Sequence, residues 1–148
     1  MTTLESKQPA VPGKGSECVT HGVRVSVSPC YLPDQSDPAR SRYVFSYRIR
    51  ITNETGAEVR LLSRHWRIID ADGELKDVRG EGVVGQQPHI PAGKSFEYSS
   101  FCPLETRWGT MEGTYTLETS DEQLIEVAVA RFYLIGPGEE QAGLAAKA

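Results

Sequence analysis

The sequence contains few of the residues that build disulfide frameworks and metal centres. Its 148 residues include three cysteines and three histidines. The cysteines are odd in number and lack C-x-x-C spacing, which favours reduced structural thiols over a disulfide framework or a zinc ribbon: Cys18, Cys30 and Cys102. No histidine has a second metal ligand at the i+2 or i+4 position, so we predict no metal site: His21, His65 and His89.

Long apolar runs and an excess of positive charge are also lacking. No stretch approaches the ~20 apolar residues that span a bilayer, and the N-terminus lacks the basic and apolar regions of a signal peptide. The net charge of −4 gives no bulk attraction to nucleic acid or to a membrane. We therefore expect a cytoplasmic protein that neither binds nucleic acid nor inserts into membranes, and no cofactor is indicated.

The two ends of the chain differ from its middle. Residues 1–15 are rich in Pro, Gly, Lys, Ser and Thr, and residues 136–148 (GPGEEQAGLAAKA) are similarly poor in large apolar side chains. Such composition is typical of flexible segments. We predict a flexible N-terminal arm (1–15), one folded domain (16–135) and a C-terminal tail (136–148).

Alternating side chains indicate strands through most of the middle. The clearest strand is 42–52, where alternate positions hold aromatic and β-branched residues: Tyr43, Phe45, Tyr47, Ile49 and Ile51. A shorter strand carries Val23, Val25 and Val27. In residues 57–70 the apolar phase switches near Leu61–Leu62, and a second switch occurs near Ala130. A β-bulge produces such a switch, because one extra residue reverses the inward side.

The remaining segments complete an all-β pattern. Residues 95–101 and 114–119 are predicted strands, and 102–113 is predicted to be an irregular connection anchored by Trp108. About seven or eight short strands with regularly spaced turns predict a two-sheet antiparallel sandwich of fibronectin type III or immunoglobulin kind. A barrel is the structural alternative. We expect both tryptophans, Trp66 and Trp108, to anchor the core.

The segment from Arg64 to Gly85 holds the motif with the most chemical content. Asp70-Ala71-Asp72-Gly73 predicts the turn of a hairpin, and the glycines then follow the pattern Gly80-x-Gly82-x-x-Gly85. That pattern binds dinucleotides when a helix follows it. Pro88 and Pro91 exclude a helix here, which leaves two alternatives. Either the glycines let the backbone turn, or their amides form an anion-binding nest beside Arg79.

These segments, taken in order, resemble the ApaG family. The resemblance covers roughly residues 18–134 and includes the hairpin, the glycine motif, the PHIPAG turn and the MEGTY segment. It implies a fibronectin type III-like sandwich and an association with cobalt tolerance and magnesium efflux. It also implies that the glycine motif, often described as pyrophosphate-binding in that family, falls on Gly80, Gly82 and Gly85. Related domains in eukaryotic F-box and polymerase-interacting proteins imply a protein-interaction role. The resemblance supplies no catalytic residues.

No catalytic constellation is evident, so we expect a non-enzymatic binding domain. Cys102 is expected to be buried, and the acidic cluster around Asp70–Asp77 is expected to shape the hairpin. The first hypothesis is a module that presents Arg64, Arg67 and Trp108 to a protein partner, with a homodimer through edge strands as a further possibility. The alternative is a sensor that holds a phosphate-containing small ligand, such as pyrophosphate or a phosphorylated nucleotide, at Gly80–Gly85, with Arg79 and either Arg64 or Arg67 as counter-charges.

Overall fold

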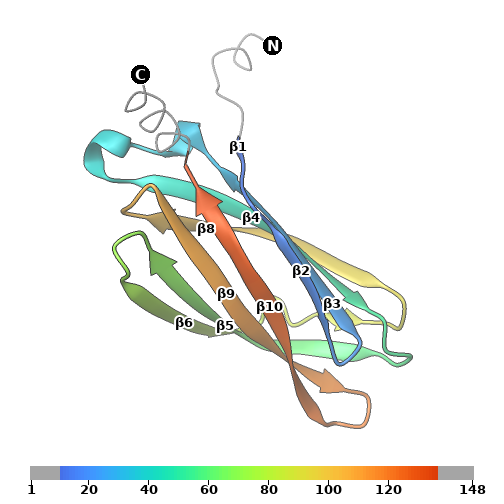
Figure 1. Ribbon diagram of the computed structural model, residues 1–148. Coiled ribbons are helices and arrows are strands. Elements are labelled where there is room, and N and C mark those ends of the chain that lie inside the picture. Colours follow the sequence, from blue (N-terminus) through green and yellow to red (C-terminus); the bar gives the residue numbers. More distant parts are fainter. Residues whose placement is uncertain (1–10, 137–148) are drawn as a thin grey trace, which may run out of the picture.

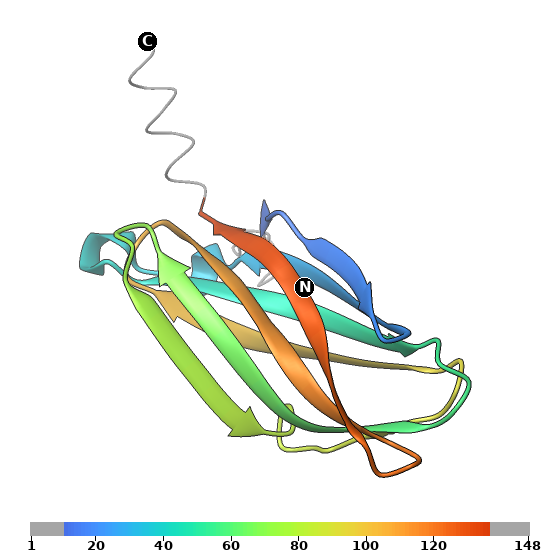
Figure 2. The same cartoon turned by 60° about the horizontal axis from the view of Figure 1, so that its bottom comes forward.

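The computed structural model describes residues 11–136, which form two antiparallel sheets packed face to face (Figures 1 and 2). The first sheet has the order β1-β3-β4-β8, with β2 also paired with β3: β1 (Val11–Pro12), β2 (Ser16–Thr20), β3 (Val23–Tyr31), β4 (Tyr43–Asn53) and β8 (Ser95–Leu104). The second has the order β10-β9-β5-β6, with β7 also paired with β5: β5 (Val59–Asp70), β6 (Leu75–Glu81), β7 (His89–Ile90), β9 (Trp108–Thr119) and β10 (Leu124–Ile135).

The two-sheet antiparallel sandwich predicted from the sequence is confirmed. The described helical elements are single 3-10 turns in the loop between β3 and β4: η1 (Pro33–Gln35) and η2 (Pro38–Arg40). No helix among residues 11–136 is long and apolar enough to cross a membrane. The hairpin at Asp70–Gly73 is also confirmed, since the Gly73 amide donates to the Asp70 carbonyl at 3.0 Å.

Both phase switches are confirmed as interruptions of the strand register. The pairing of β5 with β9 shifts between Leu61 and Ser63, and the pairing of β10 with β9 shifts between Val129 and Phe132. Each shift lets apolar residues on both sides of it face the core, because an extra residue reverses the alternation. Leu61 and Trp66 are consequently both buried on one strand.

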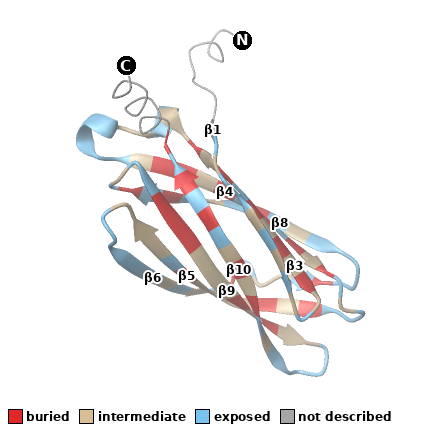
Figure 3. Ribbon diagram, viewed as in Figure 1, coloured by how far each residue is buried: buried red, intermediate tan, exposed pale blue. Residues whose placement is uncertain are grey.

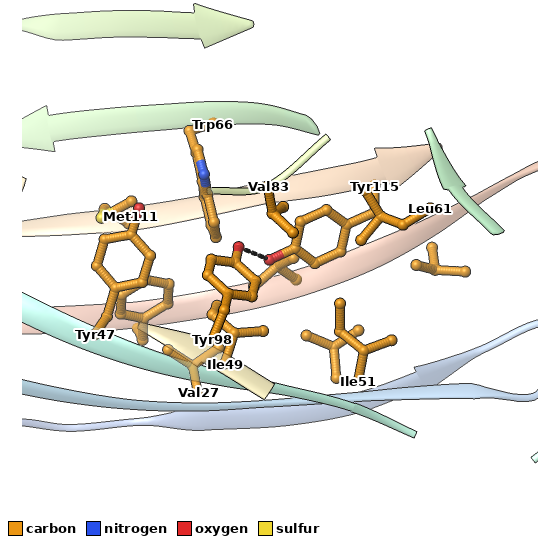
Figure 4. Packing of buried hydrophobic residues seen from close by; sticks show 14 of the residues in the cluster. Val27, Tyr47, Ile49, Ile51, Leu61, Trp66, Val83, Tyr98, Met111 and Tyr115 are labelled. Atoms are coloured by element: carbon orange, nitrogen blue, oxygen red, sulfur yellow. Dashed lines mark hydrogen bonds between the residues drawn. The ribbon is translucent and has the colours of Figure 1, made fainter. Parts of the chain in front are cut away.

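The core lies between the facing sides of the two sheets (Figure 3). Trp66 is 3% exposed and meets three aromatic rings edge-on, with centroids 5.5–6.0 Å away: Tyr47, Tyr115 and Phe132. Figure 4 shows Trp66 and Tyr115 projecting from the second sheet toward Tyr47 and Tyr98 of the first. Trp66 lies opposite Gly113, where an added Cβ would come within 3.0 Å of the indole. That Cβ would also lie 2.1 Å from the His65 carbonyl oxygen, so a side chain at Gly113 would clash with the backbone of β5 as well as press on the ring.

The predicted irregular connection over 102–113 is wrong. β8 continues to Leu104, and β9 begins at Trp108, so only residues 105–107 connect the two strands. Gly109 and Gly113 interrupt the apolar alternation there, but both face inward, at points where the backbone or side chains of neighbouring strands approach closely. Trp108 is 39% exposed on the outer side of β9, so the prediction that it anchors the core is also wrong.

Segments near the N-terminus close one side of the sandwich. The Ser16 hydroxyl donates to the Ala130 carbonyl at 2.6 Å, and the Tyr133 amide donates to the Lys14 carbonyl at 2.9 Å. Residues 11–15, which the sequence predicts as part of a flexible arm, thus pair with the body of the domain. Gly15 permits this approach, because a Cβ there would lie 2.1 Å from the Val27 carbonyl oxygen. Apart from Gly136, the predicted tail lies outside the described residues.

The opposite side of the sandwich stays open. β8 pairs only with β4, and β6 pairs only with β5, within the part of the chain that the structure describes. These two strands are therefore the unpaired edges of the two sheets, and they flank the mouth of the space between them. The candidate site lies at this open side.

A buried asparagine joins the turn regions at one end of the sandwich, and it provides a test of the fold. The Asn53 amide group donates to the carbonyls of Ala57 (2.7 Å) and Ile90 (2.8 Å) and accepts from the Thr55 amide (2.9 Å). Removing this side chain leaves buried backbone groups without partners, each at a cost of about 1–3 kcal/mol. We predict that Asn53→Ala lowers the free energy of unfolding by about 3 kcal/mol in urea titrations.

Thr52→Ala is the matched control for this change. Thr52 is adjacent and only partly buried, and its hydroxyl shares one hydrogen bond with the exposed Ser95. Its loss should cost about 1 kcal/mol or less. Equal destabilisation by the two variants would contradict the role assigned to Asn53.

Candidate functional site

The glycine motif forms the end of β6 and a tight turn. Val83 and Gln86 exchange two backbone hydrogen bonds of 2.8 Å, and the two residues between them have positive φ, 43° at Val84 and 80° at Gly85. These values are typical of a type I′ turn. A β-branched residue rarely adopts positive φ, and Val84 is also 51% exposed. β7 follows this turn in place of the helix that a dinucleotide site requires.

Three amides of this loop are engaged within the protein. The Gly82 amide donates to the Leu62 carbonyl at 2.7 Å, and the amides of Val83 and Gln86 serve the turn itself. Gly82 has a φ of 63°, and a Cβ there would lie 2.2 Å from the Gln86 carbonyl oxygen. Gly82 is therefore required for the turn, and its N–H is not available to the anion nest that the sequence suggests as one alternative.

The carbonyls of the loop instead hold the side chain of Arg64. One terminal nitrogen, Nη1, donates to the carbonyls of Gly82 (2.8 Å) and Glu81 (3.2 Å). The guanidinium lies directly over Gly80, where an added Cβ would be 2.7–2.8 Å from its atoms. Arg64 and Trp66 are two residues apart on β5, so both side chains lie on the face of the sheet that is turned toward the core. Across the sheet, Arg64 lies opposite Tyr115 of β9, which is on the same face. Its charge is thus placed at the mouth between the sheets.

Arg64 has no carboxylate partner among residues 11–136, because none of the ion pairs formed there involves it. Arg24 is paired with Glu17 and Glu54, whereas Arg60, Arg67 and Arg79 of the second sheet, like Arg64, form no ion pair among the described residues. A partly buried cation without a counter-charge is uncommon, since desolvation of a charge is costly. This unpaired guanidinium is the most unusual electrostatic feature of the open side.

Hydroxyl groups and aromatic rings line the pocket beside Arg64. The cavity has a volume of about 260 Å³ and is lined by residues of both sheets and of the glycine loop: Tyr47, Arg64, Trp66, Glu81, Val83, Val84, Gly85, Tyr98 and Ser100. At its inner end the hydroxyls of Tyr98 and Tyr115 share a hydrogen bond (Figure 4). The lining thus combines one guanidinium and one acidic residue, Glu81, with several neutral groups that can donate hydrogen bonds.

Burial keeps these tyrosines protonated. It raises the pKa of Tyr47, an effect that a hydrogen bond to Ser100 opposes, and it raises the pKa of Tyr98 and Tyr115 further. The positive charge of Arg64 lowers the pKa of all three hydroxyls, by less than burial raises it. Neutral O–H donors and a cation therefore coexist at neutral pH in one small space.

A larger cavity of about 670 Å³ lies further along the open side, near the tip of the β5–β6 hairpin. Its lining mixes acidic side chains, such as Asp70 and Glu105, with basic ones, such as Arg42 and Lys76. Opposite charges next to each other give this cavity no clear preference for a charged ligand. We take the smaller pocket as the candidate site, because the guanidinium of Arg64 in it has no carboxylate partner among the described residues. Glu81 is the one acidic residue of its lining.

The structure separates the other residues that the sequence suggests as a site. Arg67 and Arg79 have the opposite phase to Arg64 and lie exposed on the outer face of the second sheet. Trp108 lies on the same outer face but at its far end, opposite Ile135 of β10. Gly80, Gly82, Gly85 and Arg64 thus form one site, whereas Arg67, Arg79 and Trp108 are not part of it.

The histidines and Cys102 do not join this pocket. His65 contacts Asp77 at 2.8 Å, and His89 contacts Glu58 at 3.0 Å, both near the surface. Within the described residues, no group of three or more His, Cys, Asp and Glu side chains is placed to hold a metal ion. Cys102 is 4% exposed, and burial raises the pKa of its thiol to about 11, so the thiolate is scarce at neutral pH.

The geometry of the loop predicts unequal effects of substituting its glycines. Gly82→Ala combines a positive φ with a clash against the Gln86 carbonyl, so we expect a loss of about 3 kcal/mol or more in stability. Gly85→Ala meets no atom within 4 Å, so only its positive φ should matter, at about 1 kcal/mol. Thermal unfolding monitored by circular dichroism measures both. Similar losses for the two variants would contradict the packing described for Gly82.

Comparisons with known proteins agree with this architecture. The family model of the ApaG domain matches residues 33–119. Protein ApaG of Methylobacterium sp. (strain 4-46) is 50% identical over 118 residues, which are 80% of this chain and 91% of that protein. Protein ApaG of Anaeromyxobacter dehalogenans (strain 2CP-C) is 46% identical over 123 residues, 83% of this chain and 97% of that protein.

Solved structures give the same result. A Bordetella pertussis protein described as ApaA has a TM-score of 0.76 and 44% identity, covering 87% of this chain and 98% of that one. The C-terminal domain of wzt is 8% identical with a TM-score of 0.53, covering 84% of this chain and 81% of that one, and shares the fold alone. By sequence and by fold, the chain belongs to the ApaG family.

Proposed function

We propose that this chain is a non-catalytic binding domain and that its site is the pocket beside Arg64, which takes an oxyanion group such as a carboxylate or a phosphate. The observation that carries the proposal is the guanidinium of Arg64, which lies in a pocket with tyrosine hydroxyls and has no carboxylate partner among the described residues. An oxyanion bound there would supply the missing counter-charge.

The hydrogen bonds of Arg64 support this role. Its Nη1 is held by the carbonyls of Glu81 and Gly82, which fixes the plane of the guanidinium before any ligand arrives. A preorganised guanidinium presents its other N–H groups in a planar fork that matches carboxylate and phosphate oxygens. In this proposal the glycine loop positions the arginine, and the arginine binds the anion, in place of direct contact between glycine amides and a pyrophosphate.

The size of the pocket limits the ligand. Drug-sized ligands occupy cavities of roughly 300–1,000 Å³, and this pocket measures about 260 Å³. It fits an anionic head group with a short substituent better than a whole dinucleotide. Any larger part of the ligand would extend outward along the open side, past the exposed Val84.

The composition of the pocket supports binding rather than catalysis. Its described lining offers one cation, one acidic residue (Glu81) and neutral hydroxyls, and burial raises the pKa of the tyrosines away from neutrality. General acid–base catalysis requires a group whose pKa lies near the working pH. In our proposal the association of the family with cobalt tolerance and magnesium efflux arises indirectly in the cytoplasm, through what the domain binds.

A second candidate function is protein interaction through the outer face of the second sheet. Trp108 and Ile135 lie opposite each other there, and with Tyr133 they are 38–39% exposed. Exposed aromatic side chains beside an arginine, here Arg131, are typical of interaction hot spots. Trp108 is thus a contact residue of this surface, as the interaction hypothesis from the sequence proposes. The surface lies away from the Arg64 pocket.

We predict that Arg64→Met weakens oxyanion binding at least tenfold, because a charge-assisted hydrogen bond contributes about 1.5–3 kcal/mol. Isothermal titration calorimetry with phosphate, pyrophosphate and small carboxylates measures the affinity. Gly80→Ala should weaken binding as well, since its methyl group displaces the guanidinium without changing the charge.

Arg67→Met is the matched control for this prediction. It removes the same charge from the neighbouring outer face of β5, where Arg67 is exposed, and should leave binding unchanged. Equal losses for Arg64→Met and Arg67→Met would indicate diffuse electrostatic attraction and would sink the proposal. The absence of saturable binding to the wild-type chain would sink it too.

A further inference from the structure

The outer edge of β6 presents a free row of backbone groups. β6 pairs with β5 along its whole length, from Leu75 to Glu81, and no strand within residues 11–136 pairs with its other edge. An unpaired edge of this length is a template for another strand. Its sequence, LKDVRGE, contains no proline.

The hydrogen bonds to β5 show which groups point outward. The Asp70 amide donates to the Glu74 carbonyl at 3.1 Å, and the Gly82 amide donates to the Leu62 carbonyl at 2.7 Å. Because bonded and non-bonded pairs alternate in an antiparallel ladder, even-numbered residues of β6 face β5. The N–H and C=O groups of the odd-numbered residues therefore face the free edge: Leu75, Asp77, Arg79 and Glu81.

The charges along this edge are self-complementary. If a second β6 pairs antiparallel around a two-fold axis at Val78, Asp77 lies opposite the second copy's Arg79, and Arg79 lies opposite the second copy's Asp77. All four outward-facing residues then form hydrogen-bonded pairs, since odd-numbered residues oppose odd-numbered residues. A two-fold axis at Asp77 or at Arg79 would instead place like charges opposite each other, which is destabilising.

We propose that the chain forms a homodimer in which the β6 strands of two copies pair antiparallel around Val78, held by two reciprocal Asp77–Arg79 ion pairs. The second sheet then continues from one copy into the other. The two Val78 side chains, each already packed partly against its own core, meet at the axis. Lys76 faces Gly80 of the second copy, over which the guanidinium of that copy's Arg64 lies.

Three further observations fit this pairing. Arg79 is exposed and takes part in no ion pair among the described residues. The side chain of Asp77 is 49% exposed, and its one ion-pair contact within the described chain is with His65. The carboxylate can therefore accept a second cation. The hydrogen bond from His65 lowers the pKa of Asp77, which keeps its carboxylate charged at neutral pH.

The other free edge, that of β8, is protected against such pairing. The Asn53 amide donates to the Lys94 carbonyl at 2.9 Å, so even-numbered residues of β8 face β4 and odd-numbered ones face outward. Pro103 is one of these outward residues and has no N–H to donate, a common means of blocking an edge. This contrast favours β6 as the edge that binds a second copy.

Charge reversal in the full chain tests the proposal. We expect Asp77→Arg and Arg79→Asp each to place like charges opposite each other twice per dimer, and to weaken dimerisation by about tenfold or more. The double variant D77R/R79D restores opposite charges and should dimerise again. An equimolar mixture of the two single variants should form heterodimers, because each then supplies the charge that the other lacks. Sedimentation equilibrium measures all four.

Glu126→Arg is the charge control, since it makes the same change as Asp77→Arg at an exposed position of β10, on the opposite edge of the second sheet. It should leave the dimer intact. A monomeric wild-type chain at submillimolar concentration would overturn the proposal. Single variants that stay dimeric, or a mixture that stays monomeric although circular dichroism shows both variants folded, would overturn it as well. These outcomes do not depend on any ligand of the Arg64 pocket.

Discussion

The position of the Arg64 guanidinium between the two sheets determines the character of the open side of this sandwich. A charge on an inward position of a strand must be satisfied by nearby polar groups, and here the carbonyls of Glu81 and Gly82 do so. That contact requires the backbone of β6 to pass directly under the guanidinium, which only a glycine at position 80 allows. The loop, the pocket and the tyrosine hydroxyls are all arranged around this one side chain.

The two sides of the sandwich differ because, among the described residues, hydrogen bonds join the edge strands of the two sheets on one side only. On the closed side, residues 14–20 approach β10 and bond to it through Ser16 and Lys14. On the open side, β6 and β8 end their sheets without a strand between them in the described chain. A binding domain requires an accessible site on a rigid frame, and the aromatic cluster around Trp66 supplies that rigidity directly behind the pocket.

Much of the fold follows from side-chain alternation, but the site does not. The pattern of Phe45, Tyr47 and Ile49 predicts an inward face correctly, and the two phase switches predict the register shifts. The strand that begins at Trp108 escaped prediction because Gly109 and Gly113 carry no apolar side chain, although both face inward. Periodicity assigns a residue to a face of its own strand, but it does not say which strand lies across the core.

The residues of the pocket illustrate the same limit. Tyr98 and Tyr115 have inward phase in the sequence, yet their contact joins strands of different sheets, which no local pattern records. Arg64 and Trp66 are two residues apart on one strand, so their side chains lie on the same face of the sheet. This alternation was the feature of the sequence that could have indicated an inward-facing arginine. Arg79 has the opposite phase, so its proximity to the glycines in the sequence does not bring it to the pocket.

The most direct test of the oxyanion site is the NMR signal of the Arg64 side-chain Nε–H group, followed while phosphate and small carboxylates are added. A guanidinium that binds an anion should show a saturable shift of this signal and slower exchange of its protons with water. The signals of Arg67 and Arg79 should stay in place. An unchanged Arg64 signal, or equal and non-saturating shifts at all three arginines, would contradict the account.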